Sequence, residues 1–287
     1  MITPIDLFRH DFVQNAFLAG TLVAILSGLV GYFVVLRGQA FVCEAMSHVG
    51  FAGAAGAALI GVSPLIGMLL FTLLGAAGMG ALGRRLRNRD VEVGMLLAFL
   101  LGVGLLFLSF YIRNASAAVN LLFGSILSVT NADVILTGLS CLLSLIILAI
   151  LFRPLLFMSV DPDVAEARGV PIAFLSTAFL ILLAFCVAQA MQVVGVLLVF
   201  ALLIVPAAAA EKLTHSPLAA IGWSVLISLV STWGGLILAF IGHWPASFYI
   251  VSMSCGIYFL SFIPSRLHPS RSPTGVNHRG RERHLRA

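Results

Sequence analysis

Apolar residues run along the chain in long blocks, and short polar loops separate the blocks. A membrane-spanning helix needs about 20 mainly apolar residues. The pattern therefore predicts an all-α, polytopic membrane protein with eight to nine transmembrane helices within residues 1–264. The shortest block, 193–210, is either half a span or fused to its neighbour. The predicted spans are residues 13–36, 41–60, 64–83, 91–112, 131–152, 172–191, 193–210, 217–241 and 245–264.

The composition excludes the soluble classes of protein. Hydrophobic residues make up 61% of the 287 positions and charged residues 9%, whereas an ordinary soluble domain is about 25% charged. A water-soluble enzyme, a disordered protein and a secreted disulfide scaffold are thereby excluded. The four cysteines form no C-x-x-C pair and are predicted to be small buried residues without a disulfide.

The basic residues are concentrated in every second loop and in the C-terminal tail. Residues 265–287 hold six arginines and one acid, whereas residues 1–264 hold ten basic and ten acidic groups. Because basic loops stay on the cytoplasmic side, the pattern predicts a cell-membrane protein with its C-terminus inside and its N-terminus outside. The tail is predicted to be a disordered cytoplasmic segment near the bilayer, and nucleic acid is not an expected partner.

Glycine is concentrated in one part of the chain. Nine of the 34 residues from Gly50 to Gly83 are glycine, and small residues let two helices approach closely in lipid. Segments 41–60 and 64–83 are therefore predicted to pack tightly. Segments 131–152 and 172–191, rich in Leu, Ile and Phe, are predicted to face lipid.

One carboxylate and one imidazole interrupt the apolar block 41–60. Glu44 and His48 are four residues apart, so a helix presents them on one face. A carboxylate oxygen and a neutral imidazole nitrogen are ligands that a divalent first-row cation takes. Ionisable groups inside a membrane cost about 2.5–3.5 kcal/mol each and usually mark a pathway. The pair is a candidate metal site; the alternative is a hydrogen-bonded Glu–His pair that joins helices.

The loop 161–171, DPDVAEARGVP, predicts a short capped helix between two spans. Its acidic first residue can cap the helix, the following proline suits the first turn, and the glycine ends it. On the cytoplasmic side such a helix is a docking surface; the alternative is an ordinary ordered loop. The candidate docking residues are Asp161, Pro162, Asp163, Glu166, Arg168 and Gly169.

A second polar pair lies in the block 172–191 and just beyond it. Gln189 and Gln192 are three residues apart. They are candidates for lining a polar path, and the alternative is an interfacial turn.

Motifs for nucleotide binding and hydrolysis are absent from the sequence. A nucleotide-binding loop needs a lysine within its glycine-rich motif, and the single lysine, Lys212, lies between Glu211 and Leu213. No G-x-S-x-G or H-E-x-x-H motif is present either. The chain is therefore predicted to be neither a P-loop ATPase nor an intramembrane zinc protease or hydrolase of these classes.

Four stretches in order carry a resemblance to a known family. They are LRG at 36–38 with the acid–A–x–S–H pattern from Glu44, then LLFGSILSVT at 121–130, DPDVAEARGVP at 161–171 and VVGVLLVFALLIVPAAAA at 193–210. Together they resemble the permease subunits of bacterial ABC importers for zinc, manganese and iron. The likeness covers about residues 13–264.

The resemblance implies the ABC importer permease fold and a role for the candidate residues. Glu44 and His48 match the family's proposed metal ligands. Cys43-Glu44 stands where the family usually has Gly-Asp, so the carboxylate is displaced by one methylene. The helix at 161–171 matches the coupling helix that docks on the ATPase. The implied partners are a second copy of the chain, two ATPase subunits that hydrolyse the ATP, an extracytoplasmic metal receptor and the lipid bilayer.

The implied cargo is a divalent transition-metal ion, with zinc expected first and manganese next. An imidazole suits zinc, and a carboxylate suits both ions. No cofactor is expected to stay bound to the chain. Two alternatives remain: a permease for an iron–siderophore or a corrinoid, which needs a wide path with few ligands, and a membrane scaffold subunit without cargo.

The arginine-rich tail provides a first test. Truncation after Arg266 is expected to leave uptake and its dependence on metal concentration unchanged. The segment 267–287 is polar, contains helix-breaking prolines and glycines, and has no apolar periodicity with which to dock. Uptake by cells with the full-length and the truncated permease measures this. Loss of feedback by cytoplasmic metal, or tight zinc binding by the isolated tail peptide, would contradict the prediction.

Overall fold

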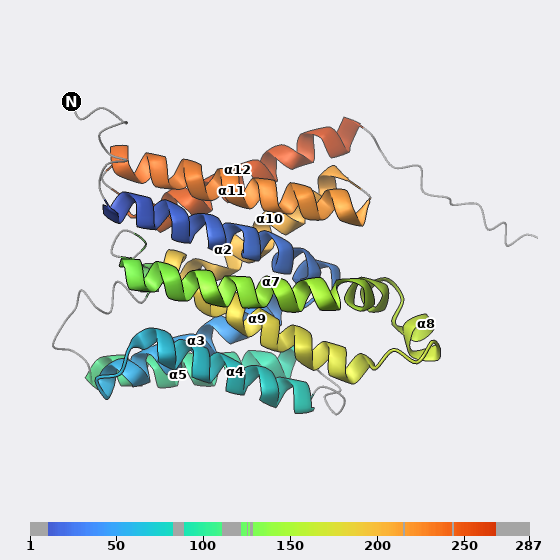
Figure 1. Ribbon diagram of the computed structural model, residues 1–287, viewed down its shortest axis with the longest axis horizontal. Helices are drawn as coiled ribbons and strands as arrows, with labels where there is room; N and C mark the ends of the chain where they lie inside the picture. Colours follow the sequence, from blue (N-terminus) through green and yellow to red (C-terminus); the bar gives the residue numbers. More distant parts are fainter. Residues whose placement is uncertain are drawn as a thin grey trace, which may run out of the picture.

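The computed structural model describes residues 11–82, 89–110, 122–124, 126, 129–214, 216–242 and 244–267. Within these ranges the chain forms ten α-helices, one 3₁₀ turn and no strand, which confirms the all-α prediction. The long helices lie roughly along one axis (Figure 1), so their backbone groups are satisfied within each helix. They are α2 (Asp11–Leu36), α3 (Ala40–Leu59), α4 (Pro64–Leu82), α5 (Arg89–Phe110), α7 (Asn131–Val160), α9 (Ile172–Val194), α10 (Val199–Leu213), α11 (Pro217–Ile241) and α12 (Ala246–Leu267).

Five of these helices, α2, α5, α7, α9 and α11, are long and apolar enough to cross a membrane. Shorter apolar stretches lie in α4 and α12. The short block at 193–210 is separated from α9 by a turn at Gly195, whose φ is 78°, and by the 3₁₀ turn η2 (Val196–Leu198). The count of eight to nine spans stays a prediction. The predicted tail comprises residues 265–287, and its part beyond Leu267 lies outside the described residues.

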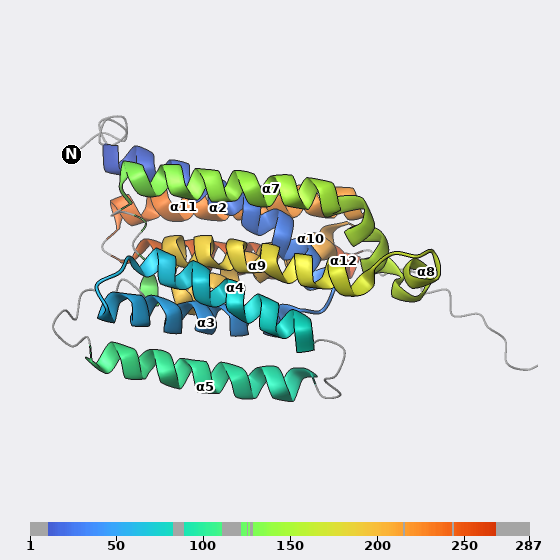
Figure 2. The same ribbon diagram turned by 60° about the horizontal axis from the view of Figure 1, so that its bottom comes forward.

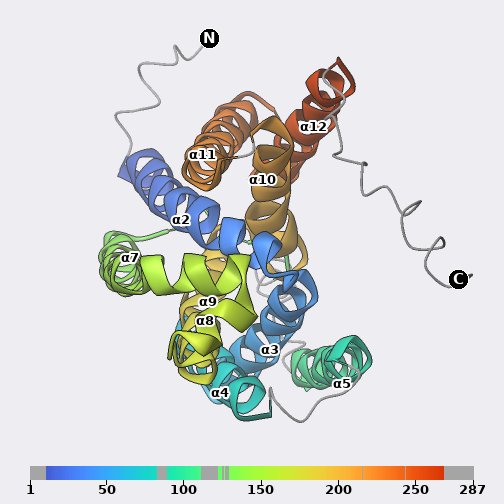
Figure 3. The same cartoon turned by 90° about the vertical axis from the view of Figure 1, so that its right-hand side faces the viewer.

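Helix α9 lies at the centre of the bundle, in contact with α2, α3, α4, α7 and α10 (Figure 3). Of its apolar span 56% is buried, against 22% of that of α7. The prediction that segment 172–191 faces lipid is therefore wrong, whereas α7 does carry an open apolar face. Lipid and the interior of a membrane protein are equally apolar, so richness in Leu, Ile and Phe does not separate the two.

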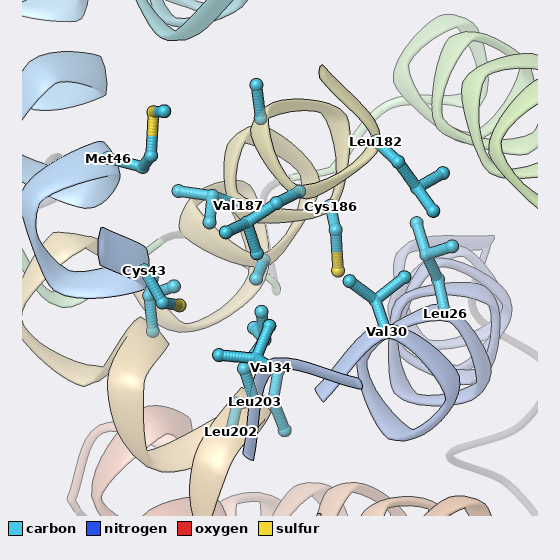
Figure 4. Packing of buried hydrophobic residues seen from close by; sticks show 14 of the residues in the cluster. Leu26, Val30, Val34, Cys43, Met46, Leu182, Cys186, Val187, Leu202 and Leu203 are labelled. Atoms are coloured by element: carbon cyan, nitrogen blue, oxygen red, sulfur yellow. The ribbon is translucent and has the colours of Figure 1, made fainter. Parts of the chain in front are cut away.

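The core around α9 joins four helices. In Figure 4, Leu182 and Cys186 of α9 lie towards Leu26 and Val30 of α2, and further core side chains come from α3 and α10. The cysteines at 43, 141 and 186 are buried and free, as the sequence predicted, whereas Cys255 is free but only partly buried, so the prediction of burial is wrong for it. These buried contacts fix α3 against the centre of the bundle.

Helices α3 and α4 pack through their glycines. A Cβ atom on Gly67 would overlap the backbone carbonyl oxygen of Gly53, and one on Gly53 would overlap that of Gly67. Only residues without a side chain permit this approach of two backbones. The predicted tight pairing of segments 41–60 and 64–83 is confirmed.

Helix α7 is longer than its predicted span. It runs for 30 residues, continues through Pro154 and ends at Val160. A short helix, α8 (Pro162–Ala167), follows and lies at one end of the bundle (Figure 1). The predicted end at residue 152 is wrong because one interior proline removes only a single hydrogen bond of the helix.

The glycine contact between α3 and α4 generates a stability prediction. Gly67→Ala is expected to destabilise the protein by about 1–3 kcal/mol, because the added methyl group pushes the two backbones apart. The matched control is Gly102→Ala on α5, where a Cβ meets nothing within 4 Å. The control should be neutral or more stable by about 0.5–1 kcal/mol, since alanine favours a helix. Thermal unfolding of both variants in detergent measures the difference; equal melting temperatures would refute the packing argument.

Candidate functional site

Glu44 and His48 lie on the same face of α3, one turn apart. His48 Nε2 is 3.3 Å from Glu44 Oε1. Since α3 begins at Ala40, the two residues stand about 6 and 12 Å along the helix from its start. The predicted juxtaposition of carboxylate and imidazole is confirmed as geometry.

The pair is mostly enclosed and keeps unused polar atoms. The His48 side chain is 7% exposed and that of Glu44 29%. Glu44 Oε2 and His48 Nδ1 are buried and have no hydrogen-bond partner in the described part of the chain. A buried polar atom without a partner costs about 1–3 kcal/mol. The two atoms are therefore free for a ligand that supplies the missing interaction.

The neighbours of the pair on α3 face elsewhere. The Ser47 hydroxyl donates a hydrogen bond to the backbone carbonyl of Glu44, at 2.7 Å. The Cys43 side chain lies among core residues such as Leu203 and Val187 (Figure 4), and it is fully buried. Neither side chain is placed to act as a ligand beside Glu44 and His48.

One copy of the chain supplies too few ligands for a complete metal site. Across the described ranges, no three His, Cys, Asp or Glu side chains gather closely enough to hold a metal ion. Zinc in proteins usually takes four ligands, and three protein ligands when a position stays open. The arrangement can therefore bind a divalent ion fully only if further ligands come from water or from another chain.

Helix α5 lies along the face of α3 that carries the pair. A Cβ atom on Gly104 of α5 would meet the Phe51 ring and the Ala52 backbone of α3. Phe51 is seven residues from Glu44 and three from His48, which puts all three on one stripe of the helix. Figure 2 shows α5 beside α3 on the outer side of the bundle. Helix α5 thus borders the pair on one side, and only 11% of its apolar span is buried, whereas the α9 side is enclosed.

The short helix α8 is well ordered by its own caps. The Asp161 side chain accepts a hydrogen bond from Val164 N at 3.0 Å, and Pro162 occupies the first turn. At the other end Gly169 takes a φ of 79°, which glycine adopts without strain. Val170 N then donates to Ala165 O at 3.1 Å, which closes the turn. The predicted capped helix at 161–171 is confirmed as structure.

Almost the whole surface of helix α8 is exposed to solvent. Ala165 alone is buried within it, and the Arg168 guanidinium lies 5.5 Å from the centre of the Phe157 ring of α7. All six candidate docking residues are exposed: Asp161, Pro162, Asp163, Glu166, Arg168 and Gly169. The helix is therefore an anchored protrusion with a free outer surface.

The two glutamines of α9 face α7. Gln192 Oε1 accepts a hydrogen bond from the Thr137 hydroxyl at 3.1 Å, and Gln189 Nε2 donates to the Ser140 hydroxyl. Sequence reasoning missed Thr137 and Ser140, whose spacing of three residues matches that of the glutamines. The pair joins two helices in this structure, and its role in lining a path stays a prediction.

The described part of the chain is thus an apolar helix bundle with an enclosed acid–imidazole pair and an anchored protrusion at one end. The chain matches the model of the ABC 3 transport family over residues 9–265. It belongs to this family, which confirms the resemblance carried by the four sequence stretches.

Characterised relatives and a solved structure agree with the assignment. The chain is 31% identical over 264 residues to the manganese transport system membrane protein MntC of Listeria innocua, covering 90% of this chain and 92% of the relative. It is 30% identical over 253 residues to the high-affinity zinc uptake system membrane protein ZnuB of Haemophilus influenzae, covering 88% and 97%. The structure of PsaBC from Streptococcus pneumoniae in complex with Fab matches with a TM-score of 0.82 and 28% identity, over 91% of this chain and 96% of that one.

Proposed function

We propose that this chain is the membrane permease subunit of an importer that carries manganese or zinc into the cytoplasm. The observation that carries the proposal is the Glu44–His48 pair, with one buried polar atom of each side chain left without a partner. The similar proteins MntC and ZnuB bear manganese and zinc in their names. Both ions therefore belong in the proposal.

Two copies of the chain would complete the ion site. In a two-fold permease each copy contributes one carboxylate and one imidazole, so four ligands meet near the axis between the copies. Mixed oxygen and nitrogen ligands suit both zinc and manganese. A small ligand set also favours transport, because a site in a pathway must release its ion as readily as it binds it.

Binding of an ion would replace the direct contact between the Glu44 and His48 side chains. Without an ion, Glu44 Oε1 and His48 Nε2 face each other at 3.3 Å. Metal ligands must be deprotonated, so an incoming ion displaces any proton that the two side chains share. The positive charge of the ion also offsets the cost of a carboxylate in an apolar bundle.

Helix α8 would transmit the movement of the ATPase subunits. Its exposed surface docks in a recess of the ATPase, and its buried Ala165 and the Arg168–Phe157 contact tie it to α7. ATP-driven closure of two ATPases then moves both α8 helices and switches access from the outer metal receptor to the cytoplasm. The end of the bundle that bears α8 is the cytoplasmic end in this proposal, consistent with the basic residues Arg168 and Lys212.

Substitution of the two proposed ligands tests the metal site. Glu44→Gln and His48→Ala are each expected to lower uptake of radiolabelled manganese and zinc to less than about a tenth of wild type. Ser47→Ala is the matched control, because Ser47 is on the same helix and its hydroxyl binds only a backbone carbonyl. Membrane insertion and melting temperature should be unchanged in all three. Near-normal uptake in both ligand variants would favour the helix-joining pair or a scaffold subunit, and uptake of a corrinoid or siderophore would favour the wide-path permease.

A second test addresses α8. Gly169→Val is expected to reduce ATPase copurification and transport severalfold, because a β-branched residue at positive φ costs about 1–3 kcal/mol and shifts the end of α8. Metal binding by the permease should persist. Gly222→Val, on an exposed position of α11 where a Cβ meets nothing within 4 Å, is the control. Full transport and normal copurification with Gly169→Val would show that docking lies elsewhere.

A further inference from the structure

A surface groove between α2 and α7 takes no part in the proposed transport site. Its volume is about 600 Å³. Leu29 of α2 forms one wall of the groove, and residues of the second half of α7 form the rest. The residues of α7 that line it are Leu145, Leu148, Ala149, Ile150, Phe152, Arg153 and Pro154.

The groove opens onto the apolar face of α7. Ile146 is 49% exposed and Ile150 is 72% exposed. Arg153 follows Ile150 by three residues and is itself exposed, so it stands on the same stripe of the helix. The exposed apolar face of α7 thus ends at the positive charge of Arg153.

Arg153 lies at the depth where lipid phosphates begin. It follows the first residue of α7, Asn131, by 22 positions, which is about 33 Å along a helix. The hydrocarbon layer is about 30 Å thick. With the start of α7 at one boundary, the Arg153 guanidinium reaches the opposite one, on the side of α8.

Within the residues that the structure describes, no group neutralises this charge. Across the described ranges, no hydrogen bond or ion pair involves Arg153. The acids of α2 and α7 are Asp11 and Asp133, both in the first turns of their helices and so at the far end of the groove. An arginine at the membrane boundary is stabilised by a counter-charge, and the chain leaves that counter-charge to a ligand.

We propose that the groove binds one anionic glycerophospholipid. An acyl chain lies along Leu145, Leu148 and Ala149, and the phosphate pairs with Arg153. A second copy of this chain is a poorer occupant. A two-fold axis along the membrane normal brings together residues of equal depth, and the groove walls on α2 and α7 offer no acid at the depth of Arg153; the exposed acids of α8, Asp161, Asp163 and Glu166, stand beyond the end of α7. The inference needs only the membrane location of the chain and does not depend on the ion transported.

Native mass spectrometry of the full-length chain, purified with its associated subunits, tests the proposal. The probes are phosphatidylglycerol and phosphatidylcholine with identical acyl chains. Wild type is expected to retain phosphatidylglycerol preferentially. Arg153→Gln should weaken that retention about fivefold, the effect of one basic residue near an anionic surface. Ala149→Phe, which fills the groove and keeps the arginine, should weaken retention as well.

Two control variants separate the groove from general effects. Lys212→Gln removes a positive charge whose ammonium lies on the Phe262 ring outside the groove, and Leu136→Phe enlarges an exposed residue of α7 nine positions before the first residue that lines the groove. Both should retain phosphatidylglycerol as wild type does. Melting temperatures identify any variant that is misfolded.

Four results would overturn the proposal. Equal retention of the two lipids would show that the charge of the headgroup does not matter. Unchanged retention by both Arg153→Gln and Ala149→Phe would show that the lipid does not bind in the groove. Displacement of the lipid by inorganic phosphate would reduce the groove to an anion site without a role for the acyl chain. Quantitative disulfide-linked dimers of an Ile150→Cys variant in membranes would show that a second copy covers the groove.

Discussion

Inside a membrane, no water is present to hydrogen-bond a polar group, so each polar group needs a partner within the protein. This constraint shapes the interior of the helix bundle. Some buried hydroxyls bind backbone carbonyls of their own helix, as Thr72 does with Met68 and Ser144 with Ser140. Five others in the described part of the chain have no hydrogen-bond partner: those of Ser27, Ser228, Ser231, Thr232 and Ser254. Others join helices: Ser224 donates to the carbonyl of Gly28, and Gln192 accepts from Thr137. Glu44 and His48 satisfy each other only in part, and the remaining deficit is what a passing cation would fill.

The same packing that encloses the pair also leaves it accessible. Glycines bring α4 against one side of α3, and the core around α9 holds another side. The face with Glu44 and His48 is bordered by α5, a helix that packs mainly on α3. The pair is therefore held on a helix fixed by α4 and the core around α9, and it borders α5, a peripheral helix of whose apolar span only 11% is buried.

Features fixed by short-range spacing could be predicted from the sequence, and features fixed by distant partners could not. The Glu44–His48 face follows from a four-residue interval, and α8 follows from an acid, a proline and a glycine at the right intervals. The glycines of α3 and α4 predicted their contact because only small residues allow it. The central place of α9 was missed because core and lipid select the same residues. The partners of Gln189 and Gln192 lie about fifty positions away, so no short-range spacing indicates them.

The composition of α3 bears on how the protein is made. Its glycines, alanines, Glu44 and His48 leave it outside the group of helices that are apolar enough to cross a membrane by themselves. Its predecessor α2 is a strongly apolar span of 26 residues with a mean hydropathy of 2.2. Insertion of α3 into lipid is less favourable than insertion of α2, and contact with α4 and α5, which pack along α3, lowers the exposure of its polar face and its backbone. The residues that give α3 its acid–imidazole pair and its glycine contacts therefore also make its insertion depend on helices that follow it in the chain.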